Sequence, residues 1–150
     1  MFNYYIYRTY FNAKHSFNGD ITKIHGHSFT VVTYIGMKDS KEDIPFFKLE
    51  AIISSFIDQY RGRYLNELPE FEGCGNTLET IGDYFYEKLR KQLMKSGMEL
   101  YQLDISENPL CVYQVSDRML LLTMNMDTSN RNYQKIFDDI LKLESMTGLS

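Results

Sequence analysis

The spacing of apolar residues changes from two to three or four and back to two along this chain, and this pattern restricts the fold more than any other feature. Residues 3–14 and 27–37 are rich in aromatic and β-branched side chains and predict two strands, joined through the Asn-Gly-Asp turn chemistry of "SFNGDITK". Residues 98–106 and 110–116 predict a second hairpin across "ENP". Each hairpin is expected to be antiparallel.

Two helices are predicted between these hairpins. One follows Pro45, and the other begins near Asn76 and Glu79, which form a capping-box-like pattern, and ends at Gly97. The apolar stripes are Phe46, Leu49, Ile53, Phe56, Ile57 and Tyr60, then Leu78, Ile81, Phe85, Leu89 and Leu93. The order β-β-α-α-β-β predicts an α+β fold in which two helices cover one face of a four-stranded antiparallel sheet.

The C-terminal part of the chain predicts an additional strand and helix. Residues 119–126 form an apolar strand-like run, and residues 127–146 show amphipathic helical spacing. No linker, repeat or low-complexity segment interrupts the 150 residues, so we expect a single domain, residues 1–150, with 117–150 as an extension.

Composition excludes several classes of function. The net charge of −4 argues against a nucleic-acid partner, because binding phosphates requires a basic surface. The N-terminus lacks the pattern of a signal peptide, and no apolar run is long enough to span a bilayer. Cys74 and Cys111 are far apart and in no metal-binding spacing, which is typical of a reducing compartment. We therefore expect a soluble cytoplasmic protein that binds neither nucleic acid nor membranes.

All three histidines of the chain, His15, His25 and His27, lie within 13 residues. Side chains two apart on a strand point to the same face, so His25 and His27 project together, and antiparallel pairing can bring His15 beside them. Three imidazoles at one end of a sheet are typical of a catalytic zinc site with an open fourth position, whereas magnesium and calcium prefer oxygen ligands. The alternative is that these are unrelated surface histidines at strand ends.

Five segments resemble, in order, the 6-pyruvoyltetrahydropterin synthase and 6-carboxytetrahydropterin synthase family. They are "FNAKHSF", "HGHSFTVVTYIG", "RYLNELPEF", "NTLETIGDYFYEKL" and "LDISEN", which lie between about residues 7 and 115. The resemblance implies a tunnelling fold, in which subunits join sheet edge to sheet edge. It also implies a homohexamer made of two trimers, with active sites between subunits. Residues 117–150 are not part of the usual pattern.

The same resemblance implies roles for individual residues. His15, His25 and His27 match the zinc ligands, and Glu107 matches the glutamate that holds the pterin ring. Thr77 and Glu79 match pocket residues. The implied protein is a zinc-dependent lyase of queuosine or biopterin biosynthesis, which acts on 7,8-dihydroneopterin triphosphate or a related pterin by elimination or carbon–carbon cleavage. From the residues alone, Thr77 and Glu79 also fit a helix start, and Glu107 fits a solvated turn.

The proton-handling residues of that family are missing from this chain. Ile21 stands where the family has a cysteine, Thr22 where a variant has glutamate, and Arg61 and Gly62 where an Asp-His pair precedes the R-Y-L-N segment. Isoleucine and glycine have no side-chain proton to exchange, and arginine stays charged. Asp20 is the nearest replacement base, although it also fits a turn residue.

Three functions therefore stay open at the level of sequence. The protein is an enzyme of this family with a replacement base, or a catalytically inactive paralogue that binds zinc and pterin and has a structural or regulatory role. The third is a different zinc-dependent activity of the tunnelling fold that needs no cysteine.

Overall fold

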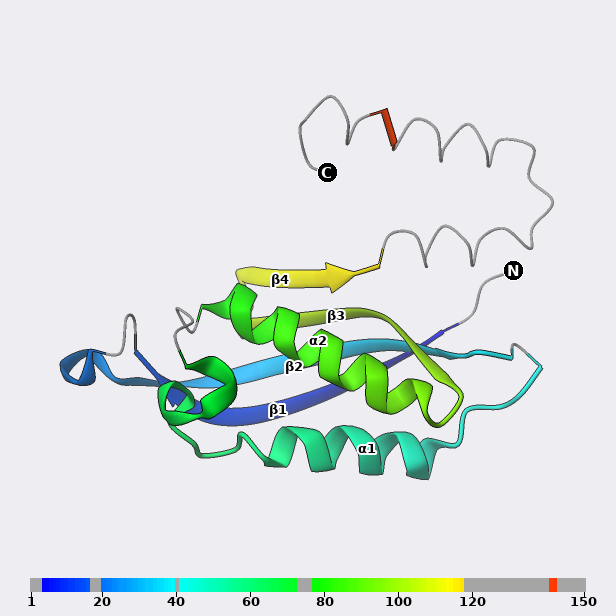
Figure 1. The fold of residues 1–150 in the computed structure, drawn as a ribbon, viewed down its shortest axis with the longest axis horizontal. Helices are drawn as coiled ribbons and strands as arrows, with labels where there is room; N and C mark the ends of the chain where they lie inside the picture. Colours follow the sequence, from blue (N-terminus) through cyan, green and yellow to red (C-terminus); the bar gives the residue numbers. More distant parts are fainter. Residues whose placement is uncertain (1–3, 17–19, 40, 73–76, 118–140, 143–150) are drawn as a thin grey trace. The chain divides into compact units, whose positions relative to one another are not determined.

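The computed structural model describes residues 4–16, 20–39, 41–72, 77–117 and 141–142. Residues Tyr4–Ser116 form one compact unit. Its strands and α-helices are β1 (Tyr5–His15), β2 (His25–Met37), α1 (Phe46–Asp58), α2 (Leu78–Met94), β3 (Met98–Asn108) and β4 (Cys111–Ser116), shown in Figure 1. The order confirms the predicted β-β-α-α-β-β arrangement. The strand and helix predicted at 119–126 and 127–146 lie outside the described residues, apart from Leu141 and Lys142.

The four strands form one sheet in the order β1-β2-β3-β4, and every neighbouring pair is antiparallel. Strand β2 begins two residues earlier than the sequence suggested, because His25 still pairs with His15 in the last step of the β1–β2 ladder. The pairing of β3 with β4 shifts register between Ser106 and Asn108. This irregularity lies at the same end of the sheet as the histidines, because Ser106 is also paired with Thr30 near the start of β2.

Both helices pack on one face of the sheet, as predicted (Figure 1). The buried residues of the helices are Leu49, Ile53, Phe56 and Ile57 in α1, and Ile81, Phe85, Leu89 and Leu93, with Gly82 and Tyr86, in α2. Phe46 is 52% exposed, so the predicted apolar stripe of α1 is wrong at its first residue. Neither of these two helices is both long and apolar enough to cross a membrane.

The helix starts differ from the predicted ones by one residue. Thr77, not Asn76, is the N-cap of α2, and its hydroxyl accepts the backbone N–H of Thr80 at 3.2 Å. Pro45 is likewise the residue before α1 rather than its first residue. After α2, Gly97 has a positive φ of 73°, a conformation in which glycine meets no steric penalty.

The hydrophobic core extends to the histidine end of the sheet. Phe11 of β1 and Phe29 of β2 stack with ring centroids 5.0 Å apart. The Phe29 ring lies 5.8 Å from that of His15 and 6.1 Å from that of His27. The imidazoles therefore lie on the helix-covered face, where the apolar core ends.

Candidate metal centre

Strand pairing brings the three histidines together. His15 is the last residue of β1 and pairs with His25, the first residue of β2, while His27 pairs with Ala13. Because side chains two apart share a face, all three imidazoles lie on the side of Phe29. His15 is buried, and His25 and His27 are half-buried. One side of the group is therefore packed against the core and the other is accessible.

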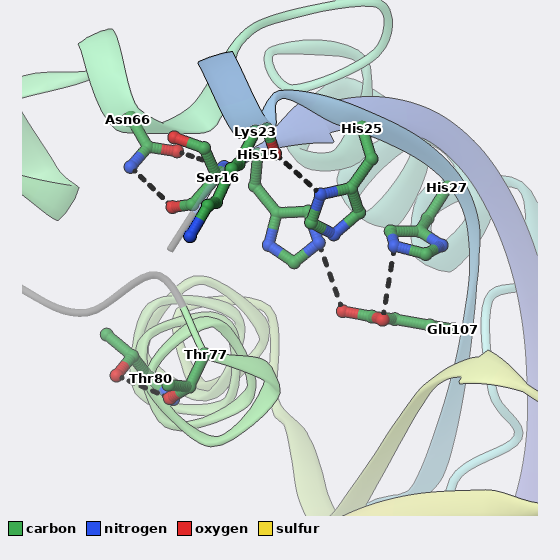
Figure 2. A network of polar contacts seen from close by, with 9 residues as sticks. All are labelled: His15, Ser16, Lys23, His25, His27, Asn66, Thr77, Thr80 and Glu107. Carbon is green, nitrogen blue, oxygen red and sulfur yellow. Dashed lines mark hydrogen bonds and ion pairs between the residues drawn. The ribbon is translucent and has the colours of Figure 1, made fainter. Parts of the chain in front are cut away.

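The three rings are close enough to share one ion. One ring nitrogen from each histidine lies within 4.8 Å of those of the other two. The ring centroids are 4.4 Å apart for His15 and His25, 4.6 Å for His25 and His27, and 5.1 Å for His15 and His27. Figure 2 shows this group with its neighbours. The structure thus confirms the predicted convergence of His15 with the other two histidines.

A backbone contact orients the His25 ring. Its Nδ1 lies 3.0 Å from the carbonyl oxygen of Lys23. A carbonyl oxygen only accepts hydrogen bonds, so Nδ1 carries a proton, and in the neutral ring Nε2 then keeps its lone pair. This is the usual arrangement of a metal-binding histidine, in which the second ring nitrogen donates to a carbonyl or carboxylate.

The electrostatic environment favours a neutral His27. Desolvation by burial lowers the pKa of His27 below 6.5, and the neighbouring His15 and His25 lower it further. Glu107 raises the pKa of His27, but by less than burial and the two histidines lower it. Metals bind the neutral form of imidazole. An all-imidazole set of borderline donors fits zinc, which the chemistry of the site favours over magnesium or calcium.

Glu107 contacts two of the histidines. Its Oε1 lies 3.3 Å from Nε2 of His15, and its Oε2 lies 3.4 Å from Nε2 of His27. The side chain is 22% exposed and comes from the end of β3. The sequence suggested a pocket role for Glu107, but not this contact, because 80 residues separate it from His27.

A second segment supports the backbone next to His15. The Asn66 side chain accepts the Ser16 N–H and donates to the Ser16 carbonyl, both at 2.9 Å. The Tyr64 and Ser16 hydroxyls are hydrogen-bonded at 2.8 Å, and the Lys14 N–H donates to the Arg63 carbonyl at 2.9 Å. Tyr64 and Asn66 belong to the "RYLN" segment, whose role the sequence did not reveal.

The remaining predicted site residues have clear local contacts. Thr77 caps α2, and Glu79 lies in the first turn of that helix, where a negative charge is favourable. Asp20 accepts hydrogen bonds from the backbone N–H and the hydroxyl of Thr22 at 3.0 and 2.6 Å. Asp20 therefore caps the short 3₁₀ turn at Ile21–Lys23. A role of these residues in binding or catalysis stays a prediction.

The positions of the expected Asp-His pair provide no acid or base. The Arg61 guanidinium donates to Asp58 Oδ1 at 3.1 Å and to the Tyr10 carbonyl at 2.9 Å. Gly62 has a φ of 73° and donates its N–H to the Asn12 carbonyl. A cavity of about 330 Å³ lies here, lined by Asn12, Ala13, Lys14, Gly26, His27, Ser28 and Gly62. Gly62, at one of the two positions where the resemblance placed a proton-handling pair, therefore borders this cavity with no side chain of its own.

Comparison with solved structures supports the fold. The 6-pyruvoyl tetrahydropterin synthase of Caenorhabditis elegans is 20% identical with a TM-score of 0.66, and the match covers 78% of this chain and 96% of that protein. The Plasmodium vivax 6-pyruvoyltetrahydropterin synthase is 16% identical with a TM-score of 0.56, over 78% of this chain and 98% of the other. At these identities the likeness shows the tunnelling fold alone. No functionally curated protein matches the chain significantly.

Family membership rests on the sequence itself. Residues 5–118 match the profile of the family described as 6-pyruvoyl tetrahydropterin synthase. The matched range comprises most of the chain, includes all three histidines and Glu107, and ends just after β4. The chain therefore belongs to the 6-pyruvoyl tetrahydropterin synthase family.

Proposed function

We propose that this protein binds zinc through His15, His25 and His27 and acts on 7,8-dihydroneopterin triphosphate or a related pterin. The observation that carries the proposal is the convergence of three imidazole nitrogens within 4.8 Å in a chain of this family. A bound zinc ion supplies Lewis-acid polarisation of a substrate side-chain oxygen, as elimination or carbon–carbon cleavage requires.

The residues around the histidines bind and orient the substrate in this proposal. The Glu107 carboxylate accepts hydrogen bonds from the N–H groups of the pterin ring, in the way a carboxylate accepts from a guanidinium fork. Thr77 and Glu79 line the pocket at the start of α2. Asp20 is the candidate base. To contact the substrate, its carboxylate would have to give up a hydrogen bond that it accepts from Thr22.

A catalytically inactive, zinc- and pterin-binding paralogue is the second candidate. It is favoured by the side chains at the proton-handling positions, since Arg61 is hydrogen-bonded elsewhere and Gly62 leaves an open cavity. Two of the solved Plasmodium vivax structures are described as variants of a catalytic glutamate. The position that the resemblance assigns to a glutamate is Thr22 in this chain. Losing a positioned acid or base costs about 10²- to 10⁴-fold in rate.

One experiment separates the two candidates. Purified, zinc-loaded protein is incubated with dihydroneopterin triphosphate, with and without a reagent that traps acetaldehyde, and the products are followed by mass spectrometry. Turnover that is lost in His27→Ala, but kept in Thr30→Ala on the opposite face of β2, supports the enzyme. If turnover is lost in Asp20→Asn as well, the result supports Asp20 as the base. Pterin binding without turnover supports the paralogue, and no pterin binding contradicts both.

We also propose a cytoplasmic homohexamer. The presence of only two cysteines in the sequence, with Cys111 free and exposed, is compatible with a reducing compartment. Strands β1 and β4 form the two edges of the sheet, and pairing between subunits would cover such edges.

A further inference from the structure

The cavity bordered by Gly62 lies on the face of the sheet that the helices leave uncovered. Its walls include two directly opposite pairs of the β1–β2 ladder, Asn12 with Ser28 and Lys14 with Gly26. Because side chains one apart on a strand point to opposite faces, those of Asn12, Lys14 and Ser28 point away from the side on which the His27 imidazole lies. The sheet therefore separates this cavity from the three imidazoles.

The polar side chains of the cavity are hydrogen-bond donors that the protein does not use. Asn12, Lys14 and Ser28 are exposed, and with the residues that the structure describes their side chains form no hydrogen bond or ion pair. The described lining includes no aspartate or glutamate. Arg63, whose carbonyl accepts the Lys14 N–H at 2.9 Å, adds a second positive charge to this edge of the sheet. An ammonium, an amide and a hydroxyl group thus border one space, and all three can donate to an anion.

Two glycines border the same space. Gly26 pairs with Lys14, and a Cβ atom added there would lie 3.9 Å from Lys14 Cγ, in ordinary contact. A Cβ atom added at Gly62 would meet no described atom within 4 Å. The absence of both side chains leaves the stem of Lys14 open to a ligand. The volume of about 330 Å³ is at the lower end of the range for pockets that hold small molecules, about 300–1,000 Å³.

We propose that this cavity binds a phosphate group, on the face of the sheet opposite the imidazoles. Lys14 supplies the positive charge, in the way that lysine binds phosphate as a point charge, and Asn12 and Ser28 donate hydrogen bonds to the phosphate oxygens. The net charge of −4 does not oppose this binding, because charges more than about 8 Å away are largely screened at physiological salt. The site requires neither zinc nor pterin, so it goes beyond the proposed function.

The first test is equilibrium dialysis of the full-length protein against radiolabelled inorganic phosphate at constant ionic strength. A chelator first removes any metal, because a zinc ion could itself bind a phosphate oxygen. We expect saturable binding of one phosphate per chain. Lys14→Met keeps the apolar stem and removes the charge, and should weaken binding at least about 10-fold. Lys48→Met removes the same charge from an exposed position of α1 and should bind phosphate as the unchanged protein does.

A second pair of variants tests the hydroxyl donor. Ser28→Ala should weaken phosphate binding about 3- to 10-fold, because one hydrogen bond is lost. Thr30→Val removes a hydroxyl two residues further along the same face of β2, outside the cavity, and should have no effect. The proposal is overturned if the unchanged protein shows no saturable binding. It is also overturned if Lys14→Met and Lys48→Met lower the affinity equally, because phosphate would then respond only to overall charge.

Further measurements identify the source of the phosphate group and keep this proposal separate from the zinc site. If Lys14→Met weakens the binding of dihydroneopterin triphosphate to zinc-loaded protein, the cavity takes the triphosphate of that pterin. If only inorganic phosphate and tripolyphosphate bind more weakly, the cavity takes a different phosphorylated ligand. His27→Ala should bind inorganic phosphate unchanged, and a loss of phosphate binding in this variant would overturn the placement on the opposite face. Unchanged zinc binding in His27→Ala would refute the zinc site and leave the phosphate site standing.

Discussion

The Asn66 amide forms two hydrogen bonds of 2.9 Å with the backbone of Ser16, one through its oxygen and one through its nitrogen. Ser16 follows His15 directly and is fully buried, so this pair fixes the chain where β1 ends. Asn66 touches neither the histidines nor Glu107 in these contacts, so it acts as a positioning residue. Groups that orient metal ligands typically affect metal affinity about 10- to 100-fold.

Replacing Asn66 tests this positioning role. We expect Asn66→Ala to lower zinc affinity about 10-fold and the free energy of unfolding by about 1–3 kcal/mol, because buried polar groups of Ser16 lose their partner. Asn66→Asp keeps the acceptor for the Ser16 N–H but sets a second acceptor oxygen against the Ser16 carbonyl, so it should also lower both zinc affinity and stability. Chelator competition and urea unfolding measure the two effects. A fall in stability with unchanged zinc affinity in both variants would contradict the positioning role.

At the scale of elements, α2 lies unusually close to the sheet. A Cβ atom added at Gly82 would come 2.7 Å from Tyr113 Cδ1 and 2.9 Å from Ile105 Cγ2, so only glycine allows this approach. The Tyr113 hydroxyl then reaches across from β4 and donates to Asp83 Oδ1 on α2 at 2.6 Å. This contact joins the edge strand to the helix whose first turn lies near the metal centre.

The Tyr113–Asp83 contact predicts a pH dependence of stability. The hydrogen bond to Asp83, followed by burial, raises the pKa of Tyr113 from 10.0 to about 12. Because the pKa of Tyr113 is higher in the folded protein, the stabilisation by the Tyr113–Asp83 hydrogen bond is fully present below pH 10. This stabilisation is lost as the pH rises toward 12. Tyr113→Phe should therefore be less stable than the unchanged protein at pH 8, by about 1 kcal/mol, and the difference should shrink between pH 10 and 12.

Urea unfolding at a series of pH values measures this difference. Tyr10→Phe is the control, because Tyr10 is 58% exposed on β1. A difference between Tyr113→Phe and the unchanged protein that stays constant from pH 8 to 12 would contradict the role of the Asp83 contact.

At the scale of the whole molecule, the two edge strands expose apolar side chains. Tyr5, Ile6 and Tyr10 of β1 are 49%, 49% and 58% exposed, and Val112 of β4 is 48% exposed. Edge strands with apolar side chains pair with other chains unless charges prevent it. The β4 edge and the first half of the β1 edge therefore suit the edge-to-edge assembly we propose, whereas Asn12 and Lys14 of β1 are already hydrogen-bonded to Gly62 and Arg63.

A single charge on an edge strand tests that assembly. We expect Val112→Lys to shift the protein from the oligomer to smaller species, because a lysine on an edge strand opposes pairing with a second sheet. Native mass spectrometry and light scattering measure the mass. Gln92→Lys, at an exposed position of α2, adds the same charge on a helix rather than on an edge strand and should leave the mass unchanged. A monomer in the unchanged protein would contradict the proposed hexamer.

Much of the element order could be read from the sequence, because hydrophobic periodicity is a local property. Leu49, Ile53 and Ile57 recur at helical spacing and are all buried, as are Ile81, Phe85 and Leu89 of the second helix. The ends of elements were predicted less well. Asn76 and Thr77 are both good N-caps, and the choice between them depends on how α2 packs rather than on propensity.

The sequence by itself determined the strand and helix pattern and the side-chain parity that places His25 and His27 on one face. It also determined that isoleucine, arginine and glycine stand at positions 21, 61 and 62, where the resemblance leads one to expect proton-handling residues. Only the tertiary structure decided that Glu107 lies against His15 and His27, and that Asn66 holds Ser16. These contacts join segments about 50 to 90 residues apart. They depend on strand register and on packing across the sheet, neither of which is set by short-range sequence pattern.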